Sequence, residues 1–418
     1  MRKWICLVLV LCVPFAAFAE GADVLNAFLS GDYKQIEGML NEEMRAAIGA
    51  DALAQGWQMQ LAQLGAFVAV HEVSEQGGAQ VLTLKHENGA QNLIVAYDGD
   101  GKIAGLMLQP AVIPQEDDRV LPANAARTDV LLFAGTEKEL RAQIIAPQEA
   151  AAYVVLAHGS GPSDMDETIA ANRPFRDLAY DLAALGVGSI RFDKITYAHP
   201  DLPCETVEQE YLAPVREALR VLKEHTGTEE AYLIGHSLGG MLMPWLVEQC
   251  GFAGGAALAG TPRKLWEISY QQNLDTIALL PPDQQAVLTA QVEAERQRAL
   301  ALAEMSDEEA RGATVFGMSA YYLRHMEKLD QIAIAKTLQK PMLFLWGEND
   351  VQVSREAFEA WQEQLGESEC WQYAVLPGLN HLFMTSDGSA NVATVMAEYS
   401  IPARMDSRVA QIIRSWLE

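Results

Sequence analysis

From about residue 128 to the C-terminus, short apolar segments alternate with amphipathic segments of helical length. Buried strands are predicted over 153–157, 187–192, 231–234, 255–259, 341–346 and 371–376. Helices are predicted between and after them, over 175–185, 206–225, 238–249, 354–365 and 407–417. Two earlier strands, 130–134 and 140–146, are expected to form a hairpin around Gly135-Thr136. Alternation of this kind is typical of an α/β fold, in which helices cover both faces of a mostly parallel sheet.

One long segment, roughly 262–338, interrupts this alternation. It is rich in Glu, Gln, Ala and Leu, contains the break Pro281-Pro282, and is predicted to be helical. An insertion after a sheet strand lies at the carboxyl ends of the strands, where open α/β sheets place their sites. We interpret the segment as a lid over a site; the alternative is a structural excursion that does not contact substrate.

The region before residue 128 has a different pattern. Residues 20–109 predict a small α+β domain, with helices over 23–40 and 41–64 and strands over 66–72, 79–86, 93–97 and 103–109. Helices followed by an antiparallel meander favour a curved sheet packed on helices. Residues 110–127 contain three prolines around an acidic stretch and are predicted to be a linker, so the larger domain spans 128–418.

The first residues have the pattern of a signal peptide. Arg2 and Lys3 precede an apolar run over 4–18 that is short for a membrane span, and Ala17-Phe18-Ala19 is a small-x-small cleavage pattern. We therefore expect residues 1–19 to be removed and the mature protein to be exported, secreted or extracytoplasmic. No later segment is long and apolar enough to span a bilayer, so stable membrane insertion is not expected after cleavage.

The net charge limits the partners that the chain can bind, and the cysteine spacing limits the metal sites and disulfides that it can form. A formal net charge of −26 repels nucleic acid and anionic membrane surfaces, and we interpret it as a solubility feature. Cys204, Cys250 and Cys370 follow the predicted signal peptide at wide spacings, without a C-x-x-C pair. That spacing disfavours a zinc site or a disulfide framework. Buried, unpaired cysteines are expected, and one disulfide with one spare thiol is the alternative.

A G-x-S-x-G pattern occurs at Gly235-His236-Ser237-Leu238-Gly239. Its glycines allow a sharp turn from strand to helix that holds a serine in a strained, exposed position. A predicted strand before the pattern and a predicted helix after it supply the structural context that this chemistry requires. Ser237 is therefore the predicted nucleophile.

A serine hydroxyl is a poor nucleophile at neutral pH and needs a base. In chains with this pattern an acid and then a histidine follow the serine. His381, after the last predicted strand, is the expected base, whereas His325 in the helical segment is interpreted as structural. Asp350 is the expected acid and Glu348 the alternative, because both follow the preceding strand. A carboxylate there would fix the imidazole tautomer and stabilise the imidazolium.

The reaction also needs donors for a developing oxyanion. The N–H of Leu238, at the start of a helix, is one expected donor. The second is expected from the loop His158-Gly159-Ser160-Gly161, through the N–H of Ser160 or of Gly159. A simple glycine-rich turn is the alternative interpretation of this loop.

Three charged residues, Arg191, Asp193 and Lys194, follow the next predicted strand. Their position near the site allows a contact with substrate. We favour instead an ion pair that braces the loop.

The segments 158–161, 235–239, 347–350 and 378–381 together resemble the α/β-hydrolase superfamily, in the expected order, and the resemblance covers about 128–418. The runs 158–164 and 191–194 are similar to those of bacterial serine esterases related to dienelactone hydrolases and to prolyl-oligopeptidase catalytic domains. Ser160 in the third place distinguishes the chain from lipase families with H-G-G-G.

This resemblance implies an eight-stranded, mostly parallel sheet and hydrolysis of acyl or acetyl esters through an acyl-enzyme. The chemistry needs no metal or organic cofactor. The region before the linker is similar to a small bacterial domain of unknown function with a nuclear-transport-factor-like cone fold.

Three functions therefore stay open at the sequence level. Hydrolysis of a small-molecule ester is favoured. A peptidase of the prolyl-oligopeptidase type is the second, and the lack of a propeller-sized region before the catalytic segment weakens it. In the third, the N-terminal domain binds a ligand or mediates a homodimer.

Overall fold

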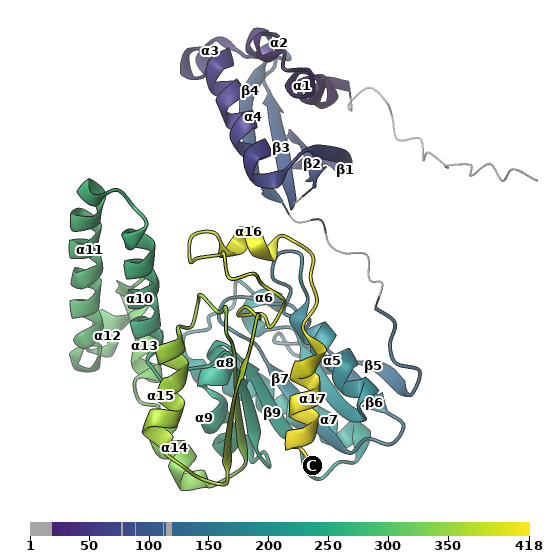
Figure 1. Ribbon diagram of the computed structural model, residues 1–418, viewed down its shortest axis with the longest axis vertical. Coiled ribbons are helices and arrows are strands. Elements are labelled where there is room, and N and C mark those ends of the chain that lie inside the picture. Colours follow the sequence, from purple (N-terminus) through teal and green to yellow (C-terminus); the bar gives the residue numbers. More distant parts are fainter. Residues whose placement is uncertain (1–18, 77, 88, 112, 114–118) are drawn as a thin grey trace, which may run out of the picture. The chain divides into compact units, whose positions relative to one another are not determined.

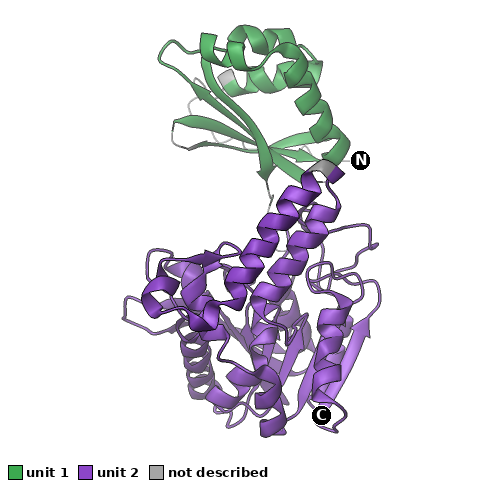
Figure 2. Cartoon of the chain, turned by 90° about the vertical axis from the view of Figure 1, so that its left-hand side faces the viewer, with its two compact units in different colours: residues 1–115 green, residues 116–418 purple. Residues whose placement is uncertain are grey.

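The computed structural model describes residues 19–76, 78–87, 89–111, 113 and 119–418. The chain forms two compact units, Met1–Gln115 and Glu116–Glu418 (Figure 2). The predicted signal peptide lies outside the described residues, except for Ala19, at which the first helix begins. Among the described residues, no helix combines the length and the apolar character that crossing a bilayer requires.

The first unit packs helices on one face of an antiparallel sheet. Its helices are α1 (Ala19–Ser30), α2 (Tyr33–Met39), α3 (Glu42–Ala47) and α4 (Ala50–Leu64). Its strands pair in chain order as β1 (Phe67–Gln76), β2 (Ala79–His86), β3 (Gly89–Tyr97) and β4 (Ile103–Ala111). Trp57 of α4 stacks on Phe28 of α1 at 4.9 Å in the core. The predicted α+β class of this unit is confirmed.

Two details of this unit differ from the sequence prediction. The two predicted helices are four, because each of them is divided. Gly31 takes a φ of +73° that ends α1, and the side chain of Asp32 caps α2. Asn41 caps α3 in the same way. The second predicted helix is divided at Ile48, whose backbone is extended between α3 and α4. In addition, β4 extends to Ala111, so the first residues of the predicted linker belong to the sheet.

The second unit is built on an eight-stranded sheet (Figure 1). In spatial order its strands are β14 (Trp371–Leu376), β13 (Met342–Gly347), β10 (Gly255–Leu258), β9 (Tyr232–His236), β7 (Ala152–Ala157), β8 (Val187–Phe192), β6 (Leu140–Pro147) and β5 (Ala125–Leu132). Only the pairs β5–β6 and β6–β8 are antiparallel. The predicted α/β class and the mostly parallel eight-stranded sheet are therefore confirmed. β5 begins at Ala125, within the stretch predicted to be a linker.

Helices cover both faces of this sheet, each over its own apolar cluster. One face carries α5 (Pro174–Ala184) and α17 (Ser407–Trp416). The other carries α7 (Ala213–Thr226), α9 (Met243–Cys250), α14 (Gln331–Leu338) and α15 (Arg355–Leu365). Short helices α6 (Ile195–Ala198), α8 (Leu238–Met241) and α16 (Val395–Tyr399) lie in the connections. β8 and β13 are buried along their whole length, as strands covered on both faces must be.

The predicted helix over 206–225 begins with a π-helical turn, η1 (Glu208–Leu212), before α7. Pro214 has no N–H to donate to the carbonyl of Glu210, and its ring would crowd that carbonyl in an α-helix. The wider turn accommodates the proline. It also presents Glu210 and Tyr211 to the loop that follows β7, as described below.

The segment between β10 and α14 is the helical insertion, which we define as residues 265–326. It consists of α10 (Leu265–Ala278), α11 (Pro282–Leu300), η2 (Leu302–Glu304), α12 (Asp307–Arg311), the short hairpin of β11 (Thr314–Val315) and β12 (Met318–Ser319), and α13 (Ala320–Met326). α10 and α11 lie side by side (Figure 1). The insertion has an apolar cluster of its own, which includes Trp266, Leu302 and Leu323.

The insertion differs from its prediction at two points. The strand pattern does not stop completely, since β11 and β12 pair within it. The insertion also ends earlier than the predicted residue 338, because α14 packs on α9 and α15 in the sheet layer. The side chain of Gln331 accepts a hydrogen bond from the N–H of Trp245 at 3.1 Å and fixes α14 there. Helical composition alone does not distinguish α14 from the helices before it.

Candidate active site

Ser237 lies in the sharp turn between β9 and α8, with φ 50° and ψ −113°. This is a strained conformation for a residue with a side chain. A Cβ atom on Gly235 would lie 2.2 Å from the carbonyl oxygen of Gly239. A Cβ atom on Gly239 would lie 2.4 Å from the carbonyl oxygen of Ala157. The strand and the helix therefore pass so closely that glycine is required at both positions, as the motif predicts.

Asp350 and His381 follow β13 and β14, which are adjacent parallel strands. Their loops therefore meet at the carboxyl edge of the sheet. Oδ2 of Asp350 lies 2.7 Å from Nδ1 of His381. Oδ1 of Asp350 accepts hydrogen bonds from the N–H groups of Gln352 at 2.8 Å and Val353 at 3.0 Å. The carboxylate is thus fixed at one oxygen and holds Nδ1 of the imidazole with the other, which leaves Nε2 for proton transfer.

The alternative acid, Glu348, and the other downstream histidine, His325, have different partners. Glu348 accepts a hydrogen bond from the N–H of Gly378 at 3.1 Å and makes no hydrogen bond to His381. His325, on α13, lies 3.5 Å from a carboxylate oxygen of Glu208, in keeping with a structural role. The geometry therefore supports Asp350 as the partner of His381.

Ser237 and His381 are brought close through His236. The rings of His236 and His381 lie 4.8 Å apart, and Nε2 of His236 lies 3.0 Å from the carbonyl oxygen of His381. Within the described part of the chain, neither the Ser237 hydroxyl nor Nε2 of His381 makes a hydrogen bond. Catalytic hydrogen bonds are often long in free enzymes and shorten only when substrate binds. The serine and the Asp–His pair thus share one loop cluster without a direct bond.

The loop 158–161 follows β7, which is the neighbour of β9, and it passes beside the serine. A Cβ atom on Gly159 would lie 3.2 Å from Cβ of Ser237. The N–H of Gly159 donates to Oε1 of Glu167 at 2.6 Å and so already has an acceptor, which favours Ser160 over Gly159 as the oxyanion donor. The N–H groups of Ser160 and Leu238 have no acceptor among the described residues, and Leu238 begins a helix. They are the two amides that we expect from the sequence to bind an oxyanion.

The buried side chain of His158 supports this loop. It is buried between Phe175 and Phe192, and its Nε2 lies 2.9 Å from the carbonyl oxygen of Asp164. Burial lowers the pKa of His158. A neutral imidazole whose Nε2–H donates to a carbonyl has a structural role here.

A buried cation supports the carbonyl side of the same loop. Lys194 is 2% exposed, and its Nζ donates to the carbonyl oxygens of Gly159 at 2.7 Å and Gly161 at 2.9 Å. Nζ also lies 2.7 Å from a carboxylate oxygen of Glu210. The hydroxyl of Tyr211 donates to the carbonyl oxygen of Gly159 at 2.6 Å. Burial lowers the pKa of Lys194, although the Glu210 carboxylate opposes that change.

The predicted bracing role of the charged residues at the end of β8 is confirmed. Arg191 lies 2.8 Å from a carboxylate oxygen of Asp166, and Asp193 lies 2.7 Å from Arg141. These contacts are ion pairs within the protein. Lys194 braces more directly than expected, because it contacts the backbone of loop 158–161 itself.

Glu167 is the site residue that sequence reasoning missed. Its side chain is buried, its φ is +51°, and its Oε1 lies 3.0 Å from Nδ1 of His236. Burial raises the pKa of Glu167, but the His236 charge and the hydrogen bonds from His236 and Gly159 outweigh burial, so the net pKa lies below its ordinary value. In the sequence Glu167 is one acidic residue of a polar loop, and no local pattern shows that it is buried.

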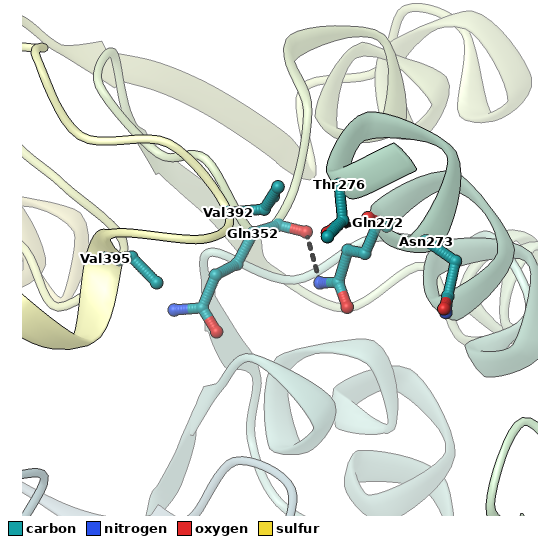
Figure 3. Close-up of a pocket in the computed structure, with 6 residues that line it drawn as sticks. All are labelled: Gln272, Asn273, Thr276, Gln352, Val392 and Val395. Carbon is teal, nitrogen blue, oxygen red and sulfur yellow. Dashed lines mark hydrogen bonds between the residues drawn. The ribbon is translucent and has the colours of Figure 1, made fainter. Parts of the chain in front are cut away.

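A polar cavity of about 250 Å³ lies beside the loop that carries Asp350 (Figure 3). It is lined by Gln272, Asn273, Thr276, Gln352, Val392 and Val395. The side chain of Gln272, on α10, donates to the carbonyl oxygen of Gln352 at 2.9 Å. The helical insertion is thus joined to the backbone two residues after Asp350.

No group of three or more metal-ligating side chains occurs among the residues that the structure describes. Cys204, Cys250 and Cys370 are unpaired, as expected, but they are half-buried rather than fully buried. Burial raises the pKa of Cys204 to about 11 and that of Cys250 to about 11.

Comparisons with known proteins agree with this geometry. A model of the Alpha/beta hydrolase family matches residues 154–395. A model described as Protein of unknown function (DUF3887) matches residues 22–106, which confirms the similarity predicted for the first unit. The chain is 31% identical to Esterase EstD of Thermotoga maritima over 418 residues, which cover 96% of each chain.

Two solved structures are also similar. An esterase of Pyrococcus furiosus is 14% identical, with a TM-score of 0.43 over 74% of this chain and 98% of that one. A dienelactone hydrolase of Anabaena variabilis is 15% identical, with a TM-score of 0.41 over 70% of this chain and 97% of that one. Because the first family model spans more than half of the sequence and one relative aligns along nearly all of it, the chain belongs to the α/β hydrolase family.

Proposed function

We propose that the protein is a serine esterase that hydrolyses carboxylic esters of small molecules through an acyl-enzyme. The observation that carries the proposal is the Asp350–His381 hydrogen bond at the sheet edge where the strained Ser237 is held. The alignment with Esterase EstD supports ester hydrolysis over peptide hydrolysis.

In the mechanism that we propose, each group has a role. Nε2 of His381 takes the hydroxyl proton as Oγ of Ser237 attacks the ester carbonyl carbon. The N–H groups of Ser160 and Leu238 stabilise the oxyanion of the tetrahedral intermediate. His381 then gives the proton to the departing alkoxide, and the acyl group stays on Ser237. A water molecule, deprotonated by His381, hydrolyses the acyl-enzyme, while Asp350 stabilises the imidazolium in both steps.

Substitution of the serine tests this mechanism. We expect Ser237→Ala to lower kcat for p-nitrophenyl acetate by about 10⁴-fold or more, because acyl transfer has no nucleophile. Ser386→Ala is the matched control: this serine is partly exposed in the loop after His381, and its variant should keep wild-type kcat. Turnover by Ser237→Ala equal to that of the wild type would remove Ser237 from the mechanism.

We further propose that the helical insertion is a cap that selects substrates. Two observations support this: α10 lines the polar cavity of Figure 3, and Gln272 is bonded to the backbone of the Asp350 loop. Amides and a hydroxyl dominate the lining contributed by α10, so the cap favours esters whose variable part is short or polar.

A further inference from the structure

Glu167 belongs to none of the roles above, yet its burial is unusual. The side chain is 2% exposed, and a glutamate is almost never fully buried unless it is paired. The loop that carries it folds around Asp164, whose carboxylate accepts hydrogen bonds from the N–H groups of Asp166 at 3.2 Å and Thr168 at 2.9 Å. The N–H of Glu167 itself donates to the carbonyl oxygen of Asp164 at 3.0 Å. This turn directs the glutamate inward.

The hydrogen bonds of His236 fix its protonation. Its Nε2 lies 3.0 Å from the carbonyl oxygen of His381, and a carbonyl only accepts, so Nε2 carries a hydrogen. Its Nδ1 lies 3.0 Å from Oε1 of Glu167, a carboxylate oxygen that accepts as well. Both ring nitrogens therefore donate, and the ring is an imidazolium paired with a carboxylate. In accordance, burial lowers the pKa of His236 but the Glu167 charge and hydrogen bonds outweigh it, and the net pKa is raised.

Oε1 of Glu167 also accepts from the N–H of Gly159 at 2.6 Å. The Glu167–His236 pair thus joins three segments. They are the loop of Gly159 and Ser160, the end of β9 directly before Ser237, and the loop of His381. We propose that Glu167 is a positioning residue, which with the His236 imidazolium clamps these three segments so that the oxyanion amide, the nucleophile and the base converge on one carbonyl group. This inference rests on the proposed function.

The clamp explains two features of the site. With the N–H of Gly159 bound to Glu167, the oxyanion amide of this loop is the next one, that of Ser160, rather than that of Gly159. Because the carboxylate neutralises His236, the imidazolium that forms on His381 during the reaction does not face an uncompensated positive charge 4.8 Å away.

The clamp also has a defined pH range. Charged or titratable groups face it from the neighbouring elements, namely His158, Lys194, Asp350 and His381. The raised pKa of His236 means that the clamp is complete below that pKa and is lost as pH rises through it. The lowered pKa of Glu167 means that the clamp is lost only as pH falls through that value. The clamp is therefore complete between the lowered pKa of Glu167 and the raised pKa of His236.

Glu167→Gln tests the inference, because glutamine keeps the shape of the side chain and an acceptor oxygen for the N–H of Gly159 but removes the charge. His236 then loses its counter-ion, burial keeps it neutral, and one of its two hydrogen bonds fails. We expect kcat for p-nitrophenyl acetate to fall about 100-fold with little change in KM, as for a displaced reacting group. The alkaline loss of activity due to His236 should disappear from the pH profile of kcat, because the variant has already lost the clamp.

Asp177→Asn is the matched control. Asp177 is also a buried carboxylate of the β7–β8 connection, paired with Arg176 at 3.1 Å and bonded to the N–H of Met405 at 3.1 Å, but it lies outside the site. Its variant should lose stability and keep the wild-type kcat per active site and pH profile. Active sites are counted by labelling Ser237 with a fluorophosphonate.

Three outcomes decide the matter. A kcat of Glu167→Gln within about twofold of wild type at every pH, or a loss no larger than that of Asp177→Asn, overturns the inference. If Glu167→Gln does not fold, His236→Gln tests the clamp from its other side, and unchanged kcat and pH profile overturn it equally. A wild type that is labelled at Ser237 but cleaves no ester contradicts only the proposed function, and the labelling rate then replaces kcat as the measure of the clamp.

Discussion

Lys194 is almost fully buried beneath loop 158–161, and four partners surround its ammonium group. Two backbone carbonyls, the Tyr211 hydroxyl and the Glu210 carboxylate each lie between 2.7 and 2.9 Å from Nζ. A buried charge with this many partners is retained because the loss of either ion leaves the other one uncompensated. The π-helical turn before α7 supplies two of the four partners, so a local distortion of a helix serves the loop beside Ser237.

At the residue scale, we expect Lys194→Met to destabilise the protein by about 3–5 kcal/mol, because Glu210 is left buried without its cation. Urea unfolding monitored by tryptophan fluorescence measures the change. The double variant Lys194→Met/Glu210→Gln should recover much of the loss, because no unpaired charge remains. Arg220→Met, which removes an exposed cation, is the control and should change stability little. A double variant less stable than Lys194→Met would contradict this account.

The residues that act through local sequence could be predicted, and those that act through burial could not. Ser237, Asp350 and His381 each follow a strand whose apolar pattern is legible, and parallel topology brings their loops to one edge of the sheet. Glu167 and Lys194 gain their roles only when segments distant in sequence bury them. The preference for Ser160 over Gly159 likewise rests on a contact with Glu167 that no sequence spacing indicates.

At the element scale, α10 presents two adjacent glutamines with different surroundings. Gln272 lines the polar cavity and bonds to the Asp350 loop, whereas the side chain of Gln271 is exposed and bonds to Asp275 on the same helix. The pair offers an internal comparison of a cavity-facing and an outward-facing position. The helix is the same, so its propensity and length do not differ between the two variants.

We expect Gln272→Leu to shift selectivity toward longer acyl chains. The ratio of kcat/KM for p-nitrophenyl octanoate to that for p-nitrophenyl acetate should rise about tenfold, because an apolar wall favours additional methylene groups. Gln271→Leu should leave this ratio unchanged. Equal ratios for both variants would show that α10 does not contact the acyl chain and would remove the cap from the proposed function.

The boundaries of the helices and strands show where a sequence pattern no longer separates one element from the next. Central strands such as β8 and β13 were predicted within a few residues because both of their faces are buried and apolar, whereas the exposed edge strand β5 begins earlier than predicted. The boundary between the insertion and α14 was not predicted correctly, because all these segments have helical composition and only the packing of α14 on α9 and α15 separates them. The extra break between α1 and α2 depends on two residues, Gly31 and Asp32, within an otherwise helical pattern.

At the scale of the whole molecule, the apolar clusters of the two units share no residues. The cluster of the first unit runs from Val24 to Ile103, and the two clusters of the large sheet contain only residues of the second unit. All residues of the candidate site lie between His158 and His381. Each unit thus has what an independently folding domain requires.

We therefore expect a fragment of residues 119–418 to fold and to hydrolyse p-nitrophenyl acetate with a kcat within about twofold of the full chain. Circular dichroism and active-site labelling report folding, and the full chain measured in parallel is the control. A folded fragment with much lower kcat would show that the first unit completes the site. Light scattering on both proteins tests whether the first unit mediates a homodimer, because the fragment would then be the smaller assembly.

Because the two cores are separate, a destabilising substitution in one unit leaves the apolar contacts of the other unit in place. A substitution that opens a void around Trp57 weakens the first unit, while the sheet that carries Ser237 keeps its own apolar contacts. Selection can then alter the first unit toward new partners without passing through catalytically dead intermediates. Lineages that carry the α/β hydrolase unit should consequently show faster sequence change, and even replacement, of the small unit in front of it.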